Sequence, residues 1–259
     1  MTDVLVLCYH AVSERWPADL AVRPEQLREQ LELLVRRGYR GTTFHDAVTS
    51  PHGSKKLAVT FDDAYCSVLE LAYPILSSLG LQATVFVVTD FAENGEPLAW
   101  PGIDHWLEGA HERELSGLSW SQLATLADAG WEIGSHTRTH PRLTRLDDDA
   151  LMRELRESRA ACERALERPC RSVAYPYGDV DHRVAAAAGA AGYVTGGMLP
   201  ARLDGATSLT WPRLGIYRAD SMRRFRMKIS PAMRRVRTIA GPAEAFVRRG
   251  VSVTKSGSS

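Results

Sequence analysis

Short apolar segments that alternate with amphipathic ones are the feature that most constrains the fold. Segments 4–9, 56–61 and 83–88 are rich in β-forming residues, and the stretches between them carry leucines at helical spacing. One such stretch begins at Pro24 and ends at Gly38, which are typical residues for the two ends of a helix. Parallel strands need a long crossover connection, which a helix supplies. The alternation therefore predicts an α/β fold with a parallel sheet, open or closed into a barrel.

The same patterns place further elements along the chain. Segment 91–118 has no clear period and is expected to form an insertion loop with short helical pieces. Ser119 is expected to cap the helix that follows it. The remaining expected strands are 39–44, 131–136, 172–175, 193–195 and 214–217, and the remaining expected helices are 65–79, 119–129, 147–167 and 181–191.

Composition is that of an ordinary globular protein. The chain has 259 residues, of which 44% are hydrophobic and 24% charged, and this length suits a single barrel of about 250 residues. No apolar run approaches the roughly 18 residues of a membrane span, and the start of the chain lacks the pattern of a signal peptide. The four cysteines show no metal-type spacing and are expected to be reduced thiols. These features predict a cytoplasmic protein.

Charge is unevenly distributed along the chain. Residues 211–259 hold 12 basic and 2 acidic side chains, and the rest of the chain holds 20 and 29. We expect a barrel over 1–220, a basic extension over 221–251 and a disordered tail over 252–259. Pro231 should divide the extension into two short helical pieces. Their mixed faces could contact an anionic membrane or lipid phosphate; alternatively, their apolar residues pack on the barrel and their arginines meet its acidic helices. No nucleic-acid partner is expected.

Polar side chains follow several of the expected strands. His10 follows the first strand, Asp62 and Asp63 follow segment 56–61, and His136 and His140 follow segment 131–136. Because the carboxyl ends of parallel strands meet at one edge, we expect these side chains to converge.

This set of side chains is suited to a catalytic metal. Two histidines and one carboxylate leave coordination positions open for water and substrate. Side chains alternate along a strand, so one aspartate can bind the metal while its neighbour faces water. Taken singly, the aspartates could instead cap a helix and the histidines could be exposed. Non-haem iron oxygenases use the same three donors, but on antiparallel barrels.

Three motifs resemble those of a known family. Segments 60–63 (Thr-Phe-Asp-Asp), 135–140 (Ser-His-Thr-Arg-Thr-His) and 174–178 (Ala-Tyr-Pro-Tyr-Gly) are similar, in order and spacing, to motifs of the NodB-homology polysaccharide deacetylases, carbohydrate esterase family 4. The resemblance covers about residues 3–217. It implies a distorted, incomplete (β/α) barrel that hydrolyses an N-acetyl or O-acetyl group on a sugar. The expected substrate is an N-acetylated oligosaccharide, lipid-linked sugar or glycosylated metabolite. A catalytically silent carbohydrate-binding protein on the same fold is the alternative.

The resemblance also implies roles for individual residues. Asp62 would be the general base, and Asp63, His136 and His140 would hold one divalent metal ion. Zinc is the expected ion, with cobalt, nickel, iron or manganese as alternatives. The backbone N–H of Tyr177 would contribute to the oxyanion hole.

Two departures from the family pattern change which residues are expected to orient the base and to act as general acid. The third motif usually begins with an arginine that orients the base, but Ala174 stands there, and no late histidine supplies the general acid. A subgroup similar to the biofilm poly-N-acetylglucosamine deacetylases begins with a Tyr-His strand, which Tyr9 and His10 match. His10 is therefore expected to be the general acid, and Arg213 is expected to replace the missing guanidinium near Asp62.

Overall fold

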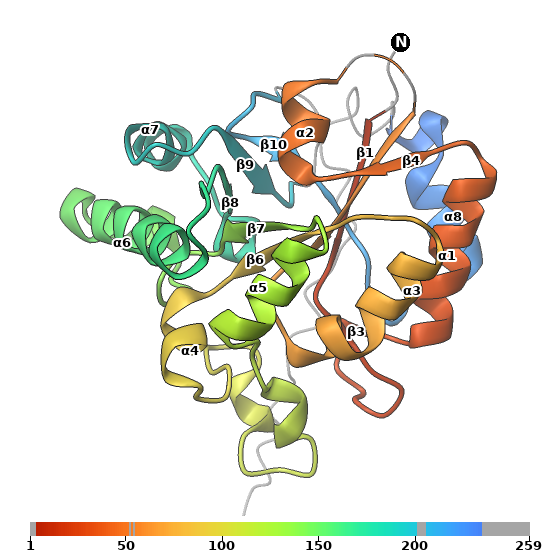
Figure 1. The fold of residues 1–259 in the computed structure, drawn as a ribbon, viewed down its shortest axis with the longest axis horizontal. Helices are drawn as coiled ribbons and strands as arrows, with labels where there is room; N and C mark the ends of the chain where they lie inside the picture. The colour runs from red at the N-terminus through yellow and green to blue at the C-terminus, as the bar shows by residue number, and fades with distance from the viewer. Residues whose placement is uncertain (1–3, 52, 54, 201–205, 235–259) are drawn as a thin grey trace, which may run out of the picture.

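Parallel strands form the centre of the molecule in the computed structural model, which describes residues 4–51, 53, 55–200 and 206–234 (Figure 1). Every described pairing in the main sheet is parallel. The prediction of a distorted, incomplete (β/α) barrel is confirmed. The strands follow the order β10 (Trp211–Pro212), β9 (Thr195–Met198), β8 (Ser172–Ala174), β7 (Glu132–Ser135), β6 (Thr84–Val87), β5 (Lys56–Phe61), β1 (Val4–Tyr9) and β11 (Leu214–Gly215). Strand β4 (Arg40–Thr42) also pairs with β5. A separate pair is formed by β2 (Ala11–Val12) and β3 (Ala21–Val22).

One short extended segment nearly closes the sheet. Its β10 part pairs with β9, and its β11 part pairs with β1 at the opposite end of the strand order. Arg213 lies between the two parts, and its backbone N–H donates to the carbonyl oxygen of Met198 at 2.9 Å. Its side chain is fully buried. The closure thus places a guanidinium inside the barrel.

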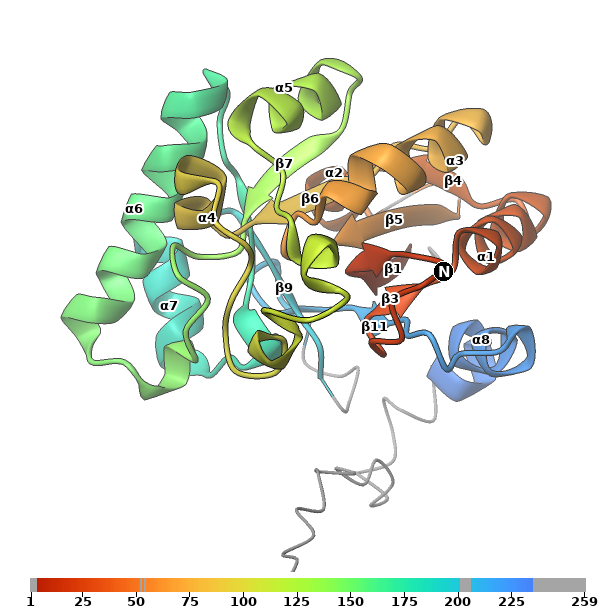
Figure 2. The same ribbon diagram turned by 90° about the horizontal axis from the view of Figure 1, so that it is seen from below.

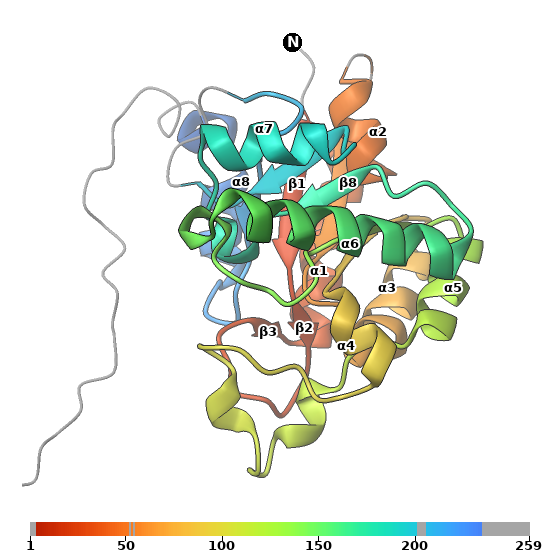
Figure 3. The ribbon, with the colours of Figure 1, turned by 90° about the vertical axis from the view of Figure 1, so that its left-hand side faces the viewer.

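Helices surround the sheet (Figures 2 and 3). Helices α6 and α7 lie side by side, and α8 lies against α1. The predicted cap at Ser119 is present, since its side chain accepts from the backbone N–H of Gln122. The helices are α1 (Pro24–Arg36), α2 (Phe44–Thr49), α3 (Tyr73–Ser78), α4 (Thr89–Asn94), α5 (Trp120–Asp128), α6 (Asp148–Leu166), α7 (His182–Ala190) and α8 (Met222–Ile229).

Two predicted elements differ in the structure. The expected strand 39–44 is shortened to β4 because Thr43 caps α2, accepting from the backbone N–H of Asp46, so that Phe44 is already helical. The expected helix 65–79 contains a wide π turn over Val68–Ala72 before α3. Pro74 has no N–H to continue the regular ladder, which accounts for the irregularity.

Two of the late strands also differ from the predictions. The expected strand 193–195 is displaced to β9, which carries Gly196 and Gly197, residues of low β-propensity that hide the strand in the sequence. The expected strand 214–217 is reduced to the two residues of β11.

The insertion 91–118 lies beside β2 and β3 in Figure 3. It begins within α4 and contains two single turns of 3₁₀ helix, Asp104–Trp106 and Glu112–Leu115. Its ends are anchored, since the N–H of Leu98 donates to Leu115 and the N–H of Leu118 donates to Ala64, each at 2.8 Å. The insertion is therefore closed on itself and joined to the loop that follows β5.

The start of the basic extension packs on the barrel. Phe225 and Ile229 of α8 are buried, whereas Arg223, Arg226 and Met227 are exposed. Helical residues resume at 231–234 after a break at Ser230. The predicted remainder of the extension and the predicted disordered tail, 252–259, lie outside the described residues. None of the described helices is long and apolar enough to cross a membrane.

Candidate active site

The structure brings the predicted site residues together at the carboxyl ends of three strands. Asp62 and Asp63 directly follow β5, His136 follows β7, and His10 follows β1. His140 returns to the same place through a tight loop. All of them except His10 are buried, with 5% exposure or less.

Three of these side chains face one point. An oxygen of Asp63 (Oδ1) lies 3.4 Å from Nε2 of His136 and 3.6 Å from Nε2 of His140. That oxygen is buried and has no hydrogen-bond partner among the described residues. Two ligand atoms of one tetrahedral zinc ion, each about 2.0–2.1 Å from it, are about 3.3 Å apart. The arrangement therefore fits a divalent cation.

The protonation of the histidines supports this fit. His136 Nδ1 lies 2.8 Å from the carbonyl oxygen of Ala174, which can only accept, so Nδ1 carries the proton and Nε2 faces Asp63. Burial lowers the pKa of His140 to about 3, which keeps its imidazole neutral. Burial alone would lower the pKa of His136, but Asp62 and Asp63 more than offset it and raise that pKa. Two acidic neighbours thus create a place for positive charge.

Asp62 is held by Arg213. Nη1 and Nη2 of Arg213 donate to the two carboxylate oxygens at 2.6 and 2.8 Å, and Nη1 also donates to Thr60 at 3.0 Å. Burial alone would raise the pKa of Asp62, but Arg213 and then His136 hold it well below its usual range. The carboxylate therefore stays ionised and fixed in direction.

The neighbouring strands leave room for this guanidinium. Ala174, at the place where the family motif has arginine, lies in an apolar cluster with Phe86, and the Arg213 guanidinium lies 5.3 Å from the Phe86 ring centroid. A Cβ at Gly197 would come within 2.7 Å of Arg213 Nε. Because Gly197 has no side chain, the Arg213 guanidinium has room to reach the barrel interior from the segment between β10 and β11.

His10 and Cys8 lie on the other side of Asp62. Cys8 Sγ donates to an Asp62 oxygen at 3.3 Å, and a ring nitrogen of His10 lies within 4.8 Å of both residues' ligand atoms. A cation is disfavoured here because both Asp62 oxygens already accept from Arg213. His10 Nδ1 is buried with no hydrogen-bond partner among the described residues. It is therefore available for proton transfer.

The histidine loop is fixed from two sides. Glu154 of α6 accepts from the backbone N–H groups of Arg138 and Thr139, at 2.9 and 3.0 Å. The ring of Trp100, from the insertion, stacks on His140 with a centroid distance of 4.1 Å and an interplanar angle of 26°. Trp100 is buried, so it positions His140 and offers little stacking surface to a sugar.

Tyr177 presents its backbone toward the same edge. Its φ of 61° is in the left-handed region, and none of the backbone bonds of the described residues uses its N–H. Its half-exposed ring lies 4.7 Å from the His140 ring and carries the Arg142 guanidinium at 4.1 Å. The strained backbone leaves a free donor beside the metal-binding cluster.

The sequence reasoning missed several supporting residues. Tyr65 is fully buried next to Asp63; burial and that carboxylate raise its pKa. Cys8, Glu154 and Gly197 were likewise not singled out. Of these residues, only Cys8 could have been found from the sequence. It lies two positions before His10, and residues two apart in a strand share a face.

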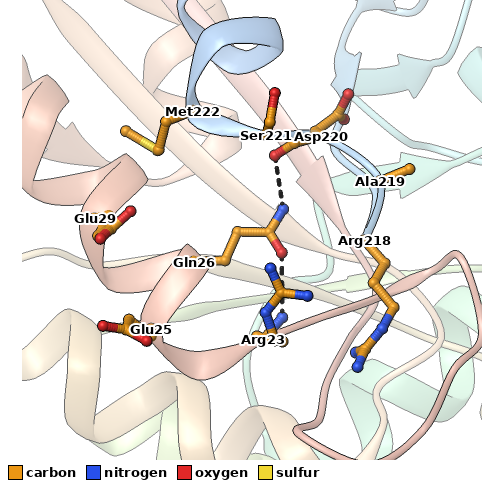
Figure 4. Close-up of a pocket in the computed structure, with 9 residues that line it drawn as sticks. All are labelled: Arg23, Glu25, Gln26, Glu29, Arg218, Ala219, Asp220, Ser221 and Met222. Carbon is orange, nitrogen blue, oxygen red and sulfur yellow. Dashed lines mark hydrogen bonds between the residues drawn. The ribbon is translucent and has the colours of Figure 1, made fainter.

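A cavity lies away from these residues. About 440 Å³ opens between the start of α1 and the segment before α8 (Figure 4). Two of its polar side chains are already paired: Gln26 donates to the carbonyl oxygens of Tyr217 and Asp220, and Arg218 donates to those of Ser13, Glu14 and Ala21. We assign it no chemistry.

Comparison with protein families gives one match. A family model described as polysaccharide deacetylase matches residues 49–196, which is more than half of the chain. Within the matched region lie Asp62, Asp63, His136, His140 and Tyr177, whereas His10 and Arg213 lie outside it.

Individual relatives agree with the family match. YxkH of Bacillus subtilis (strain 168), whose name assigns it to the polysaccharide deacetylases, is 25% identical over 196 residues, covering 74% of this chain and 62% of that relative's length. The structure of the polysaccharide deacetylase BA0330 from Bacillus anthracis has a TM-score of 0.70 at 25% identity, covering 88% of this chain and 69% of that one.

Two further structures share the fold. Streptococcus pyogenes deacetylase PplD, in complex with acetate, has a TM-score of 0.72 at 23% identity and covers 88% of this chain and 98% of that one. IcaB from Ammonifex degensii has a TM-score of 0.70 at 22% identity, with 90% and 98% covered. At these identities the likeness establishes the fold alone.

Proposed function

This chain belongs to the polysaccharide deacetylase family, and on that premise we propose that it is a metal-dependent hydrolase that removes an N-acetyl group from a saccharide. The observation that carries the proposal is the pairing of two adjacent carboxylates with different partners. Asp63 faces two histidines, and Asp62, one residue earlier, is held ionised by a buried arginine. One carboxylate is thus suited to hold a cation and the other to accept a proton.

Asp63, His136 and His140 are the proposed ligands. When bound, a divalent cation supplies Lewis acidity toward the acetyl carbonyl and makes water a better nucleophile at neutral pH. Zinc is the ion we propose first, because two imidazoles and one carboxylate are donors that catalytic zinc sites use. The Nδ1–H bond of His136 to Ala174 and the stacking of His140 on Trp100 orient both rings for this role.

Asp62 is the proposed general base. It would take the proton of the attacking water, while Arg213 keeps the carboxylate charged and prevents it from turning away. Arg213 acts through Asp62 and is a positioning residue. Because it arrives from the segment that closes the barrel, it can supply the guanidinium that Ala174 lacks.

His10 and Tyr177 complete the proposed mechanism. His10, across from the metal-binding cluster and next to Asp62, would donate a proton to the leaving amine. The free N–H of Tyr177 would donate to the oxyanion that develops on the acetyl carbonyl, where loss of one such donor costs about 3–4 kcal/mol.

The two alternative functions are less well supported. Non-haem iron oxygenases carry this donor set on antiparallel barrels, and every described pairing of the main sheet is parallel. A silent sugar-binding protein has no need for a buried, arginine-held Asp62 beside the cluster, since taking two charges out of water is costly even when they pair.

Acetate release tests the proposal. Purified protein is incubated with N-acetylglucosamine oligomers of increasing length, and with lipid-linked and metabolite-linked N-acetyl sugars, with added zinc or with a chelator. We expect acetate only with metal, and none above background from Asp62→Asn. Release that is independent of metal and of Asp62 would refute the function, and its absence on every substrate, with tight sugar binding, would favour the silent protein.

We also propose that the outward face of α8 contacts an anionic lipid surface, which would bring the site to a lipid-linked sugar. The support is its exposed Arg223, Arg226 and Met227, and each basic residue near such a surface contributes about 1 kcal/mol. Co-sedimentation with anionic vesicles should be lost as salt rises. Absence of binding at low salt, or equal binding by a double Arg223→Glu, Arg226→Glu variant, would refute this contact.

A further inference from the structure

Two buried thiols line one small cavity away from the candidate active site. Cys162 lies in α6 and Cys170 lies just before β8, and each is 1% exposed. Both thiols are free, and both line the same small cavity. None of the site residues contacts them, so the proposed hydrolysis leaves this pair unexplained.

Helix α6 fixes Cys170 against Cys162. Nε of Arg159 donates to the carbonyl oxygen of Cys170 at 3.2 Å, and the backbone N–H of Cys170 donates to Glu163 at 3.3 Å. Arg159 and Glu163 also form an ion pair at 2.9 Å. Both backbone polar groups of Cys170 are therefore bound to residues that flank Cys162 on the same helix. The segment that carries Cys170 is thus fixed against the helix that carries Cys162.

A small cavity gives access to the pair. It has a volume of about 110 Å³ and is lined by both cysteines together with Trp131, Leu166 and Arg168. One water occupies about 30 Å³ in the liquid, so this space admits a small molecule such as hydrogen peroxide. A tripeptide disulfide is too large to enter. The cavity thus selects the class of oxidant.

We propose that Cys162 and Cys170 form a peroxide-responsive dithiol pair that closes to an intramolecular disulfide. One thiol sulfur attacks an oxygen of hydrogen peroxide, the O–O bond breaks, and a sulfenic acid and one water form. The second sulfur then attacks the sulfenic sulfur, the S–S bond forms, and the second water leaves. The two thiols lose two electrons and two protons, which the peroxide takes up.

The proposed disulfide would stabilise the fold. The bond would join α6 to the segment that enters β8, whose last residue, Ala174, accepts from His136. Closing this short loop constrains the unfolded chain and should raise the Tm by about 5–10 °C.

Peptide mapping tests the proposal on the full chain. The protein is treated with hydrogen peroxide, remaining thiols are alkylated, and trypsin is added without reductant. Cleavage after Arg159, Arg164 and Arg171 releases segments 160–164 and 165–171, because the bond before Pro169 resists trypsin. We expect these two peptides joined by a disulfide that dithiothreitol cleaves, together with the higher Tm.

Cys66 provides the matched control, since it is a partly exposed thiol outside the pair. A Cys66→Ser variant should give the same linked peptides, and Cys162→Ser should give none. Oxidation confined to Cys66, with no linked peptide in the wild type, would overturn the proposal. A linked peptide that forms but lowers the Tm would overturn it as well, because the sulfurs would not be held near bonding geometry.

Discussion

Replacing Arg213 by methionine tests how the charge of Asp62 is balanced. Methionine is unbranched like arginine and keeps most of the packing, but it removes the three hydrogen bonds that Arg213 donates to Asp62 and Thr60. Asp62 is 2% exposed, so water cannot replace the lost partner. The variant therefore leaves a buried carboxylate without its arginine, with the weak Cys8 thiol as its remaining hydrogen-bond donor among the described residues.

The expected cost is large. Removing one partner of a buried ion pair destabilises a protein by about 3–5 kcal/mol. For a chain of this size each kcal/mol lowers the Tm by about 2–4 °C, so we expect Arg213→Met to lower it by roughly 6–20 °C. In an Asp62→Asn background the sign changes: Arg213 is then itself unpaired, and the same substitution should be neutral or stabilising.

The cost should also depend on pH. In the wild type Asp62 has a lowered pKa and is ionised at both pH 5 and pH 7. In the Arg213→Met variant, burial raises the pKa of Asp62 above its value of about 3.9 in the unfolded chain. The loss of stability then grows as the pH rises above about 3.9 and stops growing once the pH reaches the raised pKa. Lowering the pH from 7 to 5 should therefore reduce the cost of Arg213→Met, by up to about 1.4 kcal/mol per pH unit.

Urea unfolding followed by tryptophan fluorescence measures these free energies. The four proteins of the double-mutant cycle are compared in chelator, at pH 7 and at pH 5, so that metal binding does not contribute. An equal loss of stability from Arg213→Met in both backgrounds would refute the reasoning, because the loss would then come from packing. A cost that does not fall at pH 5 would refute the charge argument.

Three further predictions address the site directly. His136→Ala and His140→Ala should each lose bound divalent metal and activity together, as measured by equilibrium dialysis; full metal content in both would refute the ligand assignment. His10→Ala should keep its metal but lose about 10²–10⁴-fold in acetate release, the usual span of acid–base catalysis, and near-normal turnover would move that role elsewhere. Gly197→Ala should displace the buried guanidinium and cost about 1–3 kcal/mol in urea unfolding, whereas no loss would show that the strand can move away.

Periodicity was sufficient to predict a parallel sheet and the edge that carries the chemistry, whereas the distorted barrel was implied by the family resemblance. The strands that precede Asp62 and His136 were both placed to within one residue at each end, and the strand before Asp62 is a mainly apolar segment. A buried parallel strand has such a segment because both of its faces are covered. Once the sheet is parallel, its carboxyl ends share one edge, so the convergence of the aspartates and histidines follows from the fold.

The partner of Asp62 could not be found by the same reasoning. Arg213 lies 151 positions away along the chain, on an extended segment of only five residues that includes β10 and β11. Segments so short carry almost no periodic signal. The resemblance to the family suggested a replacement guanidinium, but the space left at Gly197 becomes visible only when β9 lies next to this segment.

Backbone strain is concentrated at the site, and this explains why its geometry depends on the whole fold. Of the seven non-glycine residues with positive φ in the described part of the chain, five belong to the site: Asp63, Ala64, Thr137, His140 and Tyr177. Each such conformation costs about 1–3 kcal/mol, so none would persist in an isolated loop. They are maintained because the loops leave buried strands and are anchored again, as Glu154 anchors the histidine loop. A site held in this way is preorganised, since the fold itself fixes the loops that carry its side chains.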